Sequence, residues 1–212
     1  LRKLNKHSWR ISPVGGALLV TAVIYAADTS VRGAWLDKES GFFNGVCLFL
    51  QVCGQEQAMY VVHVDPPELP PGICWQVATS LPRLTGAAGE FGAFHAAGYA
   101  DLIDHPVLMG RLTMIDFEAS GIPHALAMTG NHQVVDHARL GTDLARLCAW
   151  HIDFFGRPAP MTSYRFLLRA VAEGYGGLEH RASSALICRR DDLPCPGEAD
   201  AGPGYRQFLG LA

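Results

Sequence analysis

The sequence predicts a β-rich protein of mixed class, in which an antiparallel, sandwich-like first part precedes one long helix and a β-hairpin. Short apolar runs separated by turn residues fill roughly the first 130 residues, which is typical of strands. Helical spacing of apolar residues replaces that pattern over residues 132–155, and strand-like alternation returns from residue 164. A chain of 212 residues is long enough for one large domain or two small ones.

The apolar runs of the first part have the length of strands, and turns rich in Pro and Gly separate them. The runs cover residues 18–25, 46–52, 60–64, 75–78 and 111–117. Pro66-Pro67, Pro70-Pro71-Gly72 and His105-Pro106 are among the turns. We therefore expect a β-rich amino-terminal domain over residues 1–130.

The second part, residues 131–212, begins with a helix predicted over residues 132–155 and ended by Gly156-Arg157-Pro158. Residues 164–171 alternate as a strand does, residues 173–177 supply turn residues, and residues 178–190 read as the returning strand of a hairpin. Residues 191–204 are predicted as an exposed loop, and residues 205–212 as the beginning of a helix.

Charge and hydropathy exclude several kinds of partner. The chain carries 17 basic and 20 acidic residues, for a formal net charge of −3, so no electrostatic footprint for nucleic acid is present. The longest apolar run, over residues 15–27, is shorter than the roughly 20 residues that span a bilayer. We expect neither a nucleic-acid nor a membrane partner. The first residue is not Met and no signal-peptide region follows it, so we expect the chain to begin inside a longer protein.

The six cysteines are irregularly spaced and include no Cys-x-x-Cys pair, which argues against a zinc knuckle or a redox motif. Free thiols in a reducing, cytoplasmic compartment are therefore expected. A cysteine and a histidine that meet only in the fold could still form a nucleophile pair, and the sequence leaves that alternative open.

The common catalytic signatures are missing from this chain. It has no Gly-x-Ser-x-Gly elbow, no phosphate-binding Gly-rich loop, no dinucleotide fingerprint and no His-Glu-x-x-His zinc helix. We interpret His132, His137 and His180 as hydrogen-bonded structural histidines rather than ligands. The sequence thus predicts no metal ligand and no catalytic residue within the chain.

One segment, residues 175–180, combines two glycines with a carboxylate. Gly176 and Gly177 would let another backbone approach, and Glu179 could hold a cation such as a free α-amine beside a peptide paired to the strand edge. A Gly-Gly turn next to a solvated glutamate is the alternative interpretation of the same residues.

A series of motifs in a fixed order gives this segment its context. They read YAADTSVRGAWLD at residues 25–37, GFFNG at 41–45, WQVAT at 75–79, LIDHPV at 102–107, GIPH at 121–124, YRFLL at 164–168 and GGLEH at 176–180. Together they resemble the glycyl aminopeptidase family of zinc metallopeptidases over nearly the whole chain.

The resemblance implies a β-rich amino-terminal domain before a thermolysin-like α+β catalytic domain, usually followed by a PDZ domain. It implies that Glu179 anchors the α-amine of a peptide substrate, that Gly176 and Gly177 present backbone to that peptide, and that amino-terminal residues such as Gly or Ala are removed. Zinc is implied for the full-length protein, with its ligands beyond Ala212. The present piece alone is expected to be inactive.

The chain departs from the family pattern near its start, where a Pro-Gly-Ser-Tyr segment is missing. Loss of the first strands would expose a sheet edge, so self-association is expected. The alternative function is a non-catalytic β-sandwich module that binds a protein or peptide. A His-Glu-x-x-His motif shortly after Ala212 would favour the peptidase, and its absence the module.

Overall fold

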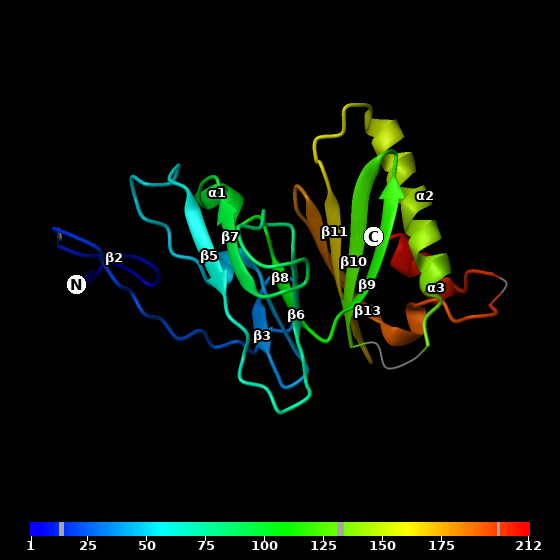
Figure 1. Ribbon diagram of the computed structural model, residues 1–212, viewed down its shortest axis with the longest axis horizontal. Helices are drawn as coiled ribbons and strands as arrows, with labels where there is room; N and C mark the ends of the chain where they lie inside the picture. The colour runs from blue at the N-terminus through cyan, green and yellow to red at the C-terminus, as the bar shows by residue number, and fades with distance from the viewer. Residues whose placement is uncertain (13–14, 131–133, 199) are drawn as a thin grey trace.

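The computed structural model describes residues 1–12, 15–130, 134–198 and 200–212, which form two units side by side (Figure 1). We call residues 1–112 the amino-terminal unit and residues 113–212 the carboxyl-terminal unit. The amino-terminal unit consists of small antiparallel sheets, whereas the carboxyl-terminal unit is one larger sheet with helices on its outer side.

The amino-terminal unit contains a four-stranded sheet of order β3-β4-β8-β6, paired antiparallel throughout, and the two-stranded sheets β5-β7 and β1-β2. Its elements are β1 (Arg2–Lys3), β2 (Trp9–Arg10), β3 (Ala34–Leu36), β4 (Ser40–Phe43), η1 (Gly45–Cys47), β5 (Tyr60–Val64), β6 (Gln76–Thr79), β7 (Gly92–Ala96), α1 (Tyr99–Leu102) and β8 (Val107–Gly110).

The carboxyl-terminal unit is built on a five-stranded sheet of order β12-β13-β11-β10-β9. β10, β11 and β13 run parallel, and β9 and β12 are its antiparallel edge strands. A helix makes the crossover between β10 and β11, as parallel pairing requires. The elements are β9 (Thr113–Ala119), β10 (Ile122–Thr129), α2 (His137–Phe155), β11 (Tyr164–Val171), β12 (Gly176–Glu179), β13 (Ser183–Arg189), η2 (Arg190–Asp192) and α3 (Pro203–Leu209).

Helix α2 covers one face of this sheet with a stripe of apolar side chains. Leu140, Leu144, Cys148 and Ile152 recur every fourth residue and are all buried. Asp136 caps the helix, because its Oδ1 accepts a hydrogen bond from the Arg139 N–H at 3.0 Å. The core between α2, α3 and the sheet includes Leu126, Met128, Phe166, Leu168, Leu186 and Phe208.

The opposite face of the sheet packs against the amino-terminal unit. Alternate residues of its central strands point there, since successive side chains of a strand lie on opposite faces. The resulting interface contains Val31, Trp35, Phe42, Ala78 and Leu108 from one unit and Ala127, Leu167 and Ala185 from the other. The Arg169 guanidinium lies 4.7 Å from the centre of the Trp35 ring, which adds a cation–π contact.

The predicted β-rich class with antiparallel sheets is confirmed, and strands occur at residues 60–64, 76–79, 113–119 and 164–171. The long helix is also confirmed, although it begins at His137. Residues 132 and 133 of the predicted helix, including His132, lie outside the described residues. The predicted boundary near residue 130 falls within the carboxyl-terminal unit, because β9 and β10 are hydrogen-bonded into the same sheet as β11.

The predicted hairpin is wrong in its partners. β11 pairs parallel with β13, and the hairpin is instead formed by β12 and β13. Gly176 and Gly177 lie in strand β12 rather than in a turn, and the chain reverses at residues 180–182, where the His180 N–H donates to the Ser183 carbonyl at 2.8 Å. The final helix also differs from the prediction, because α3 begins at Pro203 and ends at Leu209.

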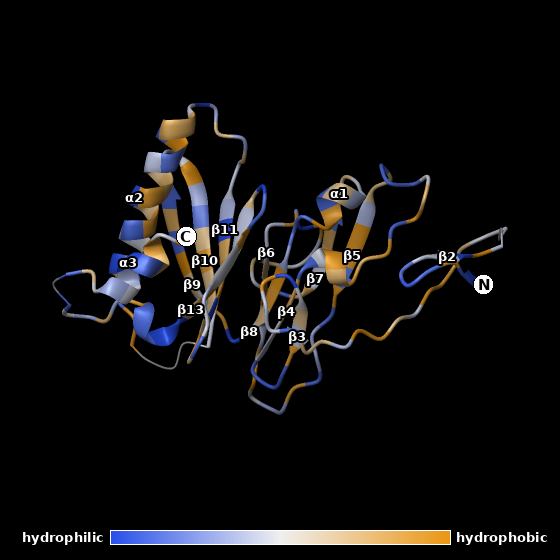
Figure 2. Cartoon of the chain, turned by 180° about the vertical axis from the view of Figure 1, so that it is seen from behind, coloured by the Kyte–Doolittle hydropathy of each residue, from blue (hydrophilic) through white to orange (hydrophobic). Residues whose placement is uncertain are grey.

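Two further predicted strands are absent from the described residues. Residues 18–25 belong to no sheet, and Leu19 and Val23 are 90% and 97% exposed, because no described strand lies beside this segment to complete its hydrogen bonds. Figure 2 shows this apolar stretch between β2 and β3. At residues 46–52 the chain turns instead into η1, whose first turn is capped by Asn44. Self-association stays a prediction.

No helix among the described residues is long and apolar enough to cross a membrane.

A substitution in the interface between the units tests the packing. Leu167 is 2% exposed, so Leu167→Ala should lower the free energy of unfolding by about 2–5 kcal/mol through lost burial and the cavity left behind. Leu36→Ala on β3 is the matched control, because that side chain is 55% exposed and its loss should cost less than about 0.5 kcal/mol. Urea unfolding of both variants gives the comparison, and equal stabilities would contradict the packing described here.

Candidate active site at the edge of the five-stranded sheet

The segment with Gly176, Gly177 and Glu179 forms β12, an edge strand of the five-stranded sheet. β12 is paired with β13 on one side, and none of the described strands pairs with its other side. Its free backbone groups can therefore pair with an added extended chain. A Cβ on Gly176 would meet no atom within 4 Å, whereas a Cβ on Gly177 would lie 2.9 Å from Leu211 Cδ1. A side chain at 177 would therefore require the end of the Leu211 side chain to shift.

Glu179 is the exposed last residue of β12, and the pairing register shows which face it occupies. It lies opposite Ser184 of β13, and directly opposed side chains share a face. Leu186, two residues along β13, packs in the core beneath α2, so Ser184 and Glu179 lie on the α2 face. Glu179 forms no ion pair among the described residues, which leaves its charge available to a ligand.

A row of buried and half-buried polar and aromatic groups continues from Glu179 across this face. The Ser184 and Tyr164 hydroxyl oxygens are 2.6 Å apart, and the Tyr164 ring lies 6.0 Å from the ring of His124, which in turn stacks on Phe117 at 5.2 Å. Burial raises the pKa of Tyr164, and the charge of Glu179 contributes to the same direction. Tyr164 therefore keeps its proton and remains a hydrogen-bonding group.

His124 belongs to this row, and His180 lies in the turn that follows Glu179. The side chains of both histidines are largely shielded from solvent. Burial lowers the pKa of His124, while its Nδ1, 2.8 Å from the Ile122 carbonyl oxygen, favours a neutral Nδ1–H tautomer. Burial also lowers the pKa of His180, and the nearby Asp104 opposes that shift. The Nε2 atom of His180 is buried without a hydrogen-bond partner among the described residues, so a proton there would be unpaired. Of the histidines interpreted as structural from the sequence, His180 contacts Asp104 at 3.5 Å and His137 is exposed at the start of α2.

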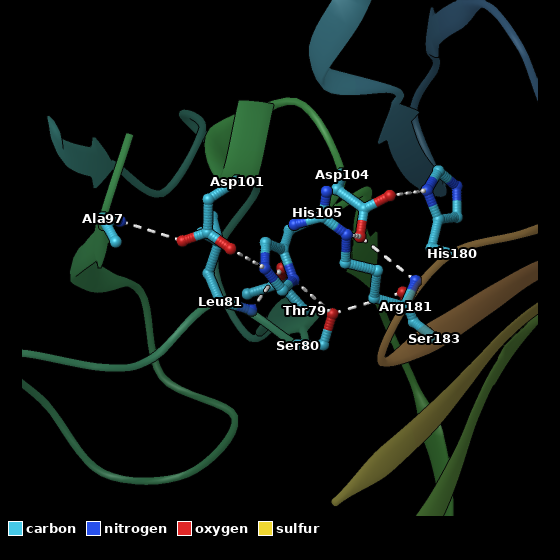
Figure 3. A network of polar contacts seen from close by, with 10 residues as sticks. All are labelled: Thr79, Ser80, Leu81, Ala97, Asp101, Asp104, His105, His180, Arg181 and Ser183. Carbon is cyan, nitrogen blue, oxygen red and sulfur yellow. Dashed lines mark hydrogen bonds and ion pairs between the residues drawn. The ribbon is translucent and has the colours of Figure 1, made fainter. Parts of the chain in front are cut away.

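The turn that follows Glu179 is held by the amino-terminal unit (Figure 3). Asp104, in the loop between α1 and β8, accepts a hydrogen bond at Oδ2 from the Arg181 N–H at 3.1 Å, and its Oδ1 lies 3.5 Å from His180 Nδ1. Beside it, the Ser80 hydroxyl donates to Ser183 Oγ at 3.2 Å and lies 2.7 Å from His105 Nδ1. Polar contacts from two loops therefore fix this turn from both ends.

Sequence reasoning did not single out Asp104, Tyr164 or Ser184 as parts of the site. The alternation of residues 164–171 placed Tyr164 on one face of a strand, which is the only available signal for it. No sequence pattern connects Asp104 with a turn 77 residues later.

Metal and thiol chemistry find no support among the described residues. No group of three His, Cys, Asp or Glu side chains there could hold a metal ion, so we assign no zinc ligand in this part of the chain and derive no step through a metal. All six cysteines are free, as predicted. Burial raises the pKa of Cys148 to about 11 and that of Cys188 to about 12, which keeps both as unreactive thiols.

Comparison with known proteins adds an independent observation. A family model described as "Peptidase M61 N-terminal domain" matches residues 1–111 of the 212, just over half of the chain, and ends directly before β9. None of the curated proteins compared with the chain matches it.

Solved structures are similar as well. An aminopeptidase N family protein from Idiomarina loihiensis is similar at 43% identity and a TM-score of 0.82, over 88% of this chain and 31% of that one. An M1 zinc metallopeptidase from Deinococcus radiodurans is similar at 15% identity and a TM-score of 0.45, over 79% of this chain and 40% of that one. The chain thus spans about a third of the length of the first of these proteins.

The buried neutral histidines predict how stability depends on pH. Their folded-state pKa values lie below the unfolded value of about 6.5, so unfolding takes up protons below that pH and stability falls as the pH drops through this window. Each histidine contributes at most about 1.4 kcal/mol per pH unit. Urea unfolding between pH 5.5 and 7.5 should therefore show increasing stability.

Two variants and a control test whether these two histidines cause the pH dependence of stability. His124→Asn and His180→Asn remove the titrating rings and should each flatten the dependence, while His63→Asn, at an exposed position of β5, is the matched control. A wild-type stability that is constant over this pH range would contradict the assignment of both histidines as neutral in the fold.

Proposed function

Because the chain belongs to the M61 peptidase family, we propose that the full-length protein is a zinc-dependent aminopeptidase and that Glu179 binds the α-amine of its peptide substrate. The position of Glu179 is the observation that carries this proposal. An exposed carboxylate with no ion pair to another described residue ends an edge strand that can accept an extended peptide.

The described residues support two tasks in binding. The free edge of β12, with the open space beside Gly176, offers main-chain groups to an extended peptide, as β-augmentation requires. Glu179, at the end of that strand, supplies a charged acceptor for one ammonium group. A peptide held by both contacts has its amino terminus at a fixed place, so cleavage elsewhere along the peptide would be disfavoured.

Zinc belongs to this proposal as the group that would polarise the scissile carbonyl when bound in the full-length protein. The described residues include no ligand set for it. The preference for amino-terminal Gly or Ala is proposed from the family resemblance alone. The chain's own residues bind and orient the substrate.

Replacement of Glu179 in the full-length, zinc-loaded protein tests the amine anchor. Charged hydrogen bonds contribute about 1.5–3 kcal/mol, so Glu179→Gln should lower kcat/KM for free-amine substrates such as glycyl and alanyl p-nitroanilides by roughly ten- to a hundredfold. Zinc content, measured by metal analysis, should not change.

Two controls define the outcome. Glu173→Gln makes the same chemical change at an exposed position in the loop before β12 and should retain wild-type kcat/KM. Amino-blocked substrates offer no ammonium, so Glu179→Gln should treat them no worse than the wild type does. Wild-type efficiency of Glu179→Gln on free-amine substrates would falsify the anchor.

A further inference from the structure

The last residue of an edge strand is poorly fixed by the sheet itself. Among the described strands, β12 is hydrogen-bonded to β13 alone, and the chain leaves the sheet directly after Glu179. Strand ends with one neighbour are prone to local opening, because few contacts hold them. A carboxylate that must meet one ammonium group needs a second source of order, since orientation errors of a fraction of an ångström weaken a charged hydrogen bond.

Asp104 supplies such order from the other unit. Its carboxylate contacts the two residues that immediately follow Glu179, through the Arg181 N–H at 3.1 Å and the His180 ring at 3.5 Å (Figure 3). The His180 side chain is 7% exposed and that of Asp104 is 23% exposed, so this contact is shielded from water and charge screening is reduced. The contact therefore fixes the direction in which the chain leaves β12.

A second contact of the same interface serves as an internal comparison. Ser80 bonds to Ser183, which is the first residue of β13 and lies beyond the turn. It is held in turn by His105, whose Nε2 lies 3.4 Å from Asp101 Oδ1. The Ser80 contact thus secures the interface near the same turn without touching the residues next to Glu179.

We infer that Asp104 is a positioning residue for the amine anchor, through which the amino-terminal unit sets the orientation of Glu179. This inference rests on the proposed function. It assigns the amino-terminal unit a part in substrate selection: the anchor's backbone is held by a carboxylate from the other unit, and formation of the interface and of the amine site are coupled.

A double-mutant cycle in the full-length, zinc-loaded protein separates positioning from general support. Asp104→Ala should raise KM for glycyl p-nitroanilide by roughly fivefold to tenfold with a smaller change in kcat, because the loss concerns binding of the amine. Asp104→Asn keeps the size and one acceptor oxygen, so it should recover part of this loss. If Asp104 acts through Glu179, Asp104→Ala should have almost no further effect in the Glu179→Gln background.

Ser80→Ala is the matched control, because it removes the neighbouring interface contact. Its effect on KM should be small, and any effect should persist in the Glu179→Gln background. Thermal unfolding of each variant shows whether it is folded, and Asp104→Asn carries the test if Asp104→Ala is not.

The outcomes distinguish this inference from the function on which it rests. Additive effects of Asp104→Ala and Glu179→Gln, or equal effects of Asp104→Ala and Ser80→Ala on KM, would show that Asp104 only supports the interface and would overturn the inference. If Glu179→Gln alone leaves KM and kcat unchanged, the amine anchor itself is wrong and the inference is overturned with it.

Discussion

The structure depends most on the burial of both faces of the five-stranded sheet. One face is covered by α2 and α3, and the other by the sheet β3-β4-β8-β6 of the amino-terminal unit. Strand β11 shows the result, because Phe166 and Leu168 enter the core beneath α2 while Leu167 enters the interface between the units. Strands covered on both faces become almost continuously apolar, as residues 166–168 are.

This double coverage determines where polar chemistry can occur. Apolar side chains pack on both faces of the central strands, so the accessible backbone of the sheet is at its edges, of which β12 is one. On the α2 face of that edge, Tyr164 and Ser184 pair their hydroxyl groups and satisfy each other, while Glu179 projects beyond them into solvent. The side chains on this face therefore become more polar from the buried core toward the edge, where Glu179 carries a charge.

Local sequence patterns predicted the elements better than their partners. The fourfold spacing of Leu140, Leu144 and Ile152 identified α2, and the alternation of residues 164–171 identified β11, because both patterns depend on one buried face. Alternation of apolar and polar residues does not reveal the direction of a strand relative to its neighbours, or which strands those neighbours are. The parallel pairing of β11 with β13 was therefore not predictable from the sequence. The glycines at 176 and 177 resembled a turn, since glycine is common both in turns and where another segment approaches a strand. The true reversal at residues 180–182 contains neither Gly nor Pro and is held by a distant aspartate.

The same distant contact bears on the role proposed for Glu179. A carboxylate selects an external ammonium only if no internal cation occupies it, and Arg181 is the Arg or Lys nearest to Glu179 in the sequence. Its main-chain N–H donates to Asp104, and its Nε lies 4.0 Å from the same carboxylate. The Arg181 side chain, which is 72% exposed, therefore lies beside a carboxylate of the amino-terminal unit. In the proposed amine site, Asp104 would thus serve two needs, because it contacts the backbone beside Glu179 and lies next to the neighbouring cation.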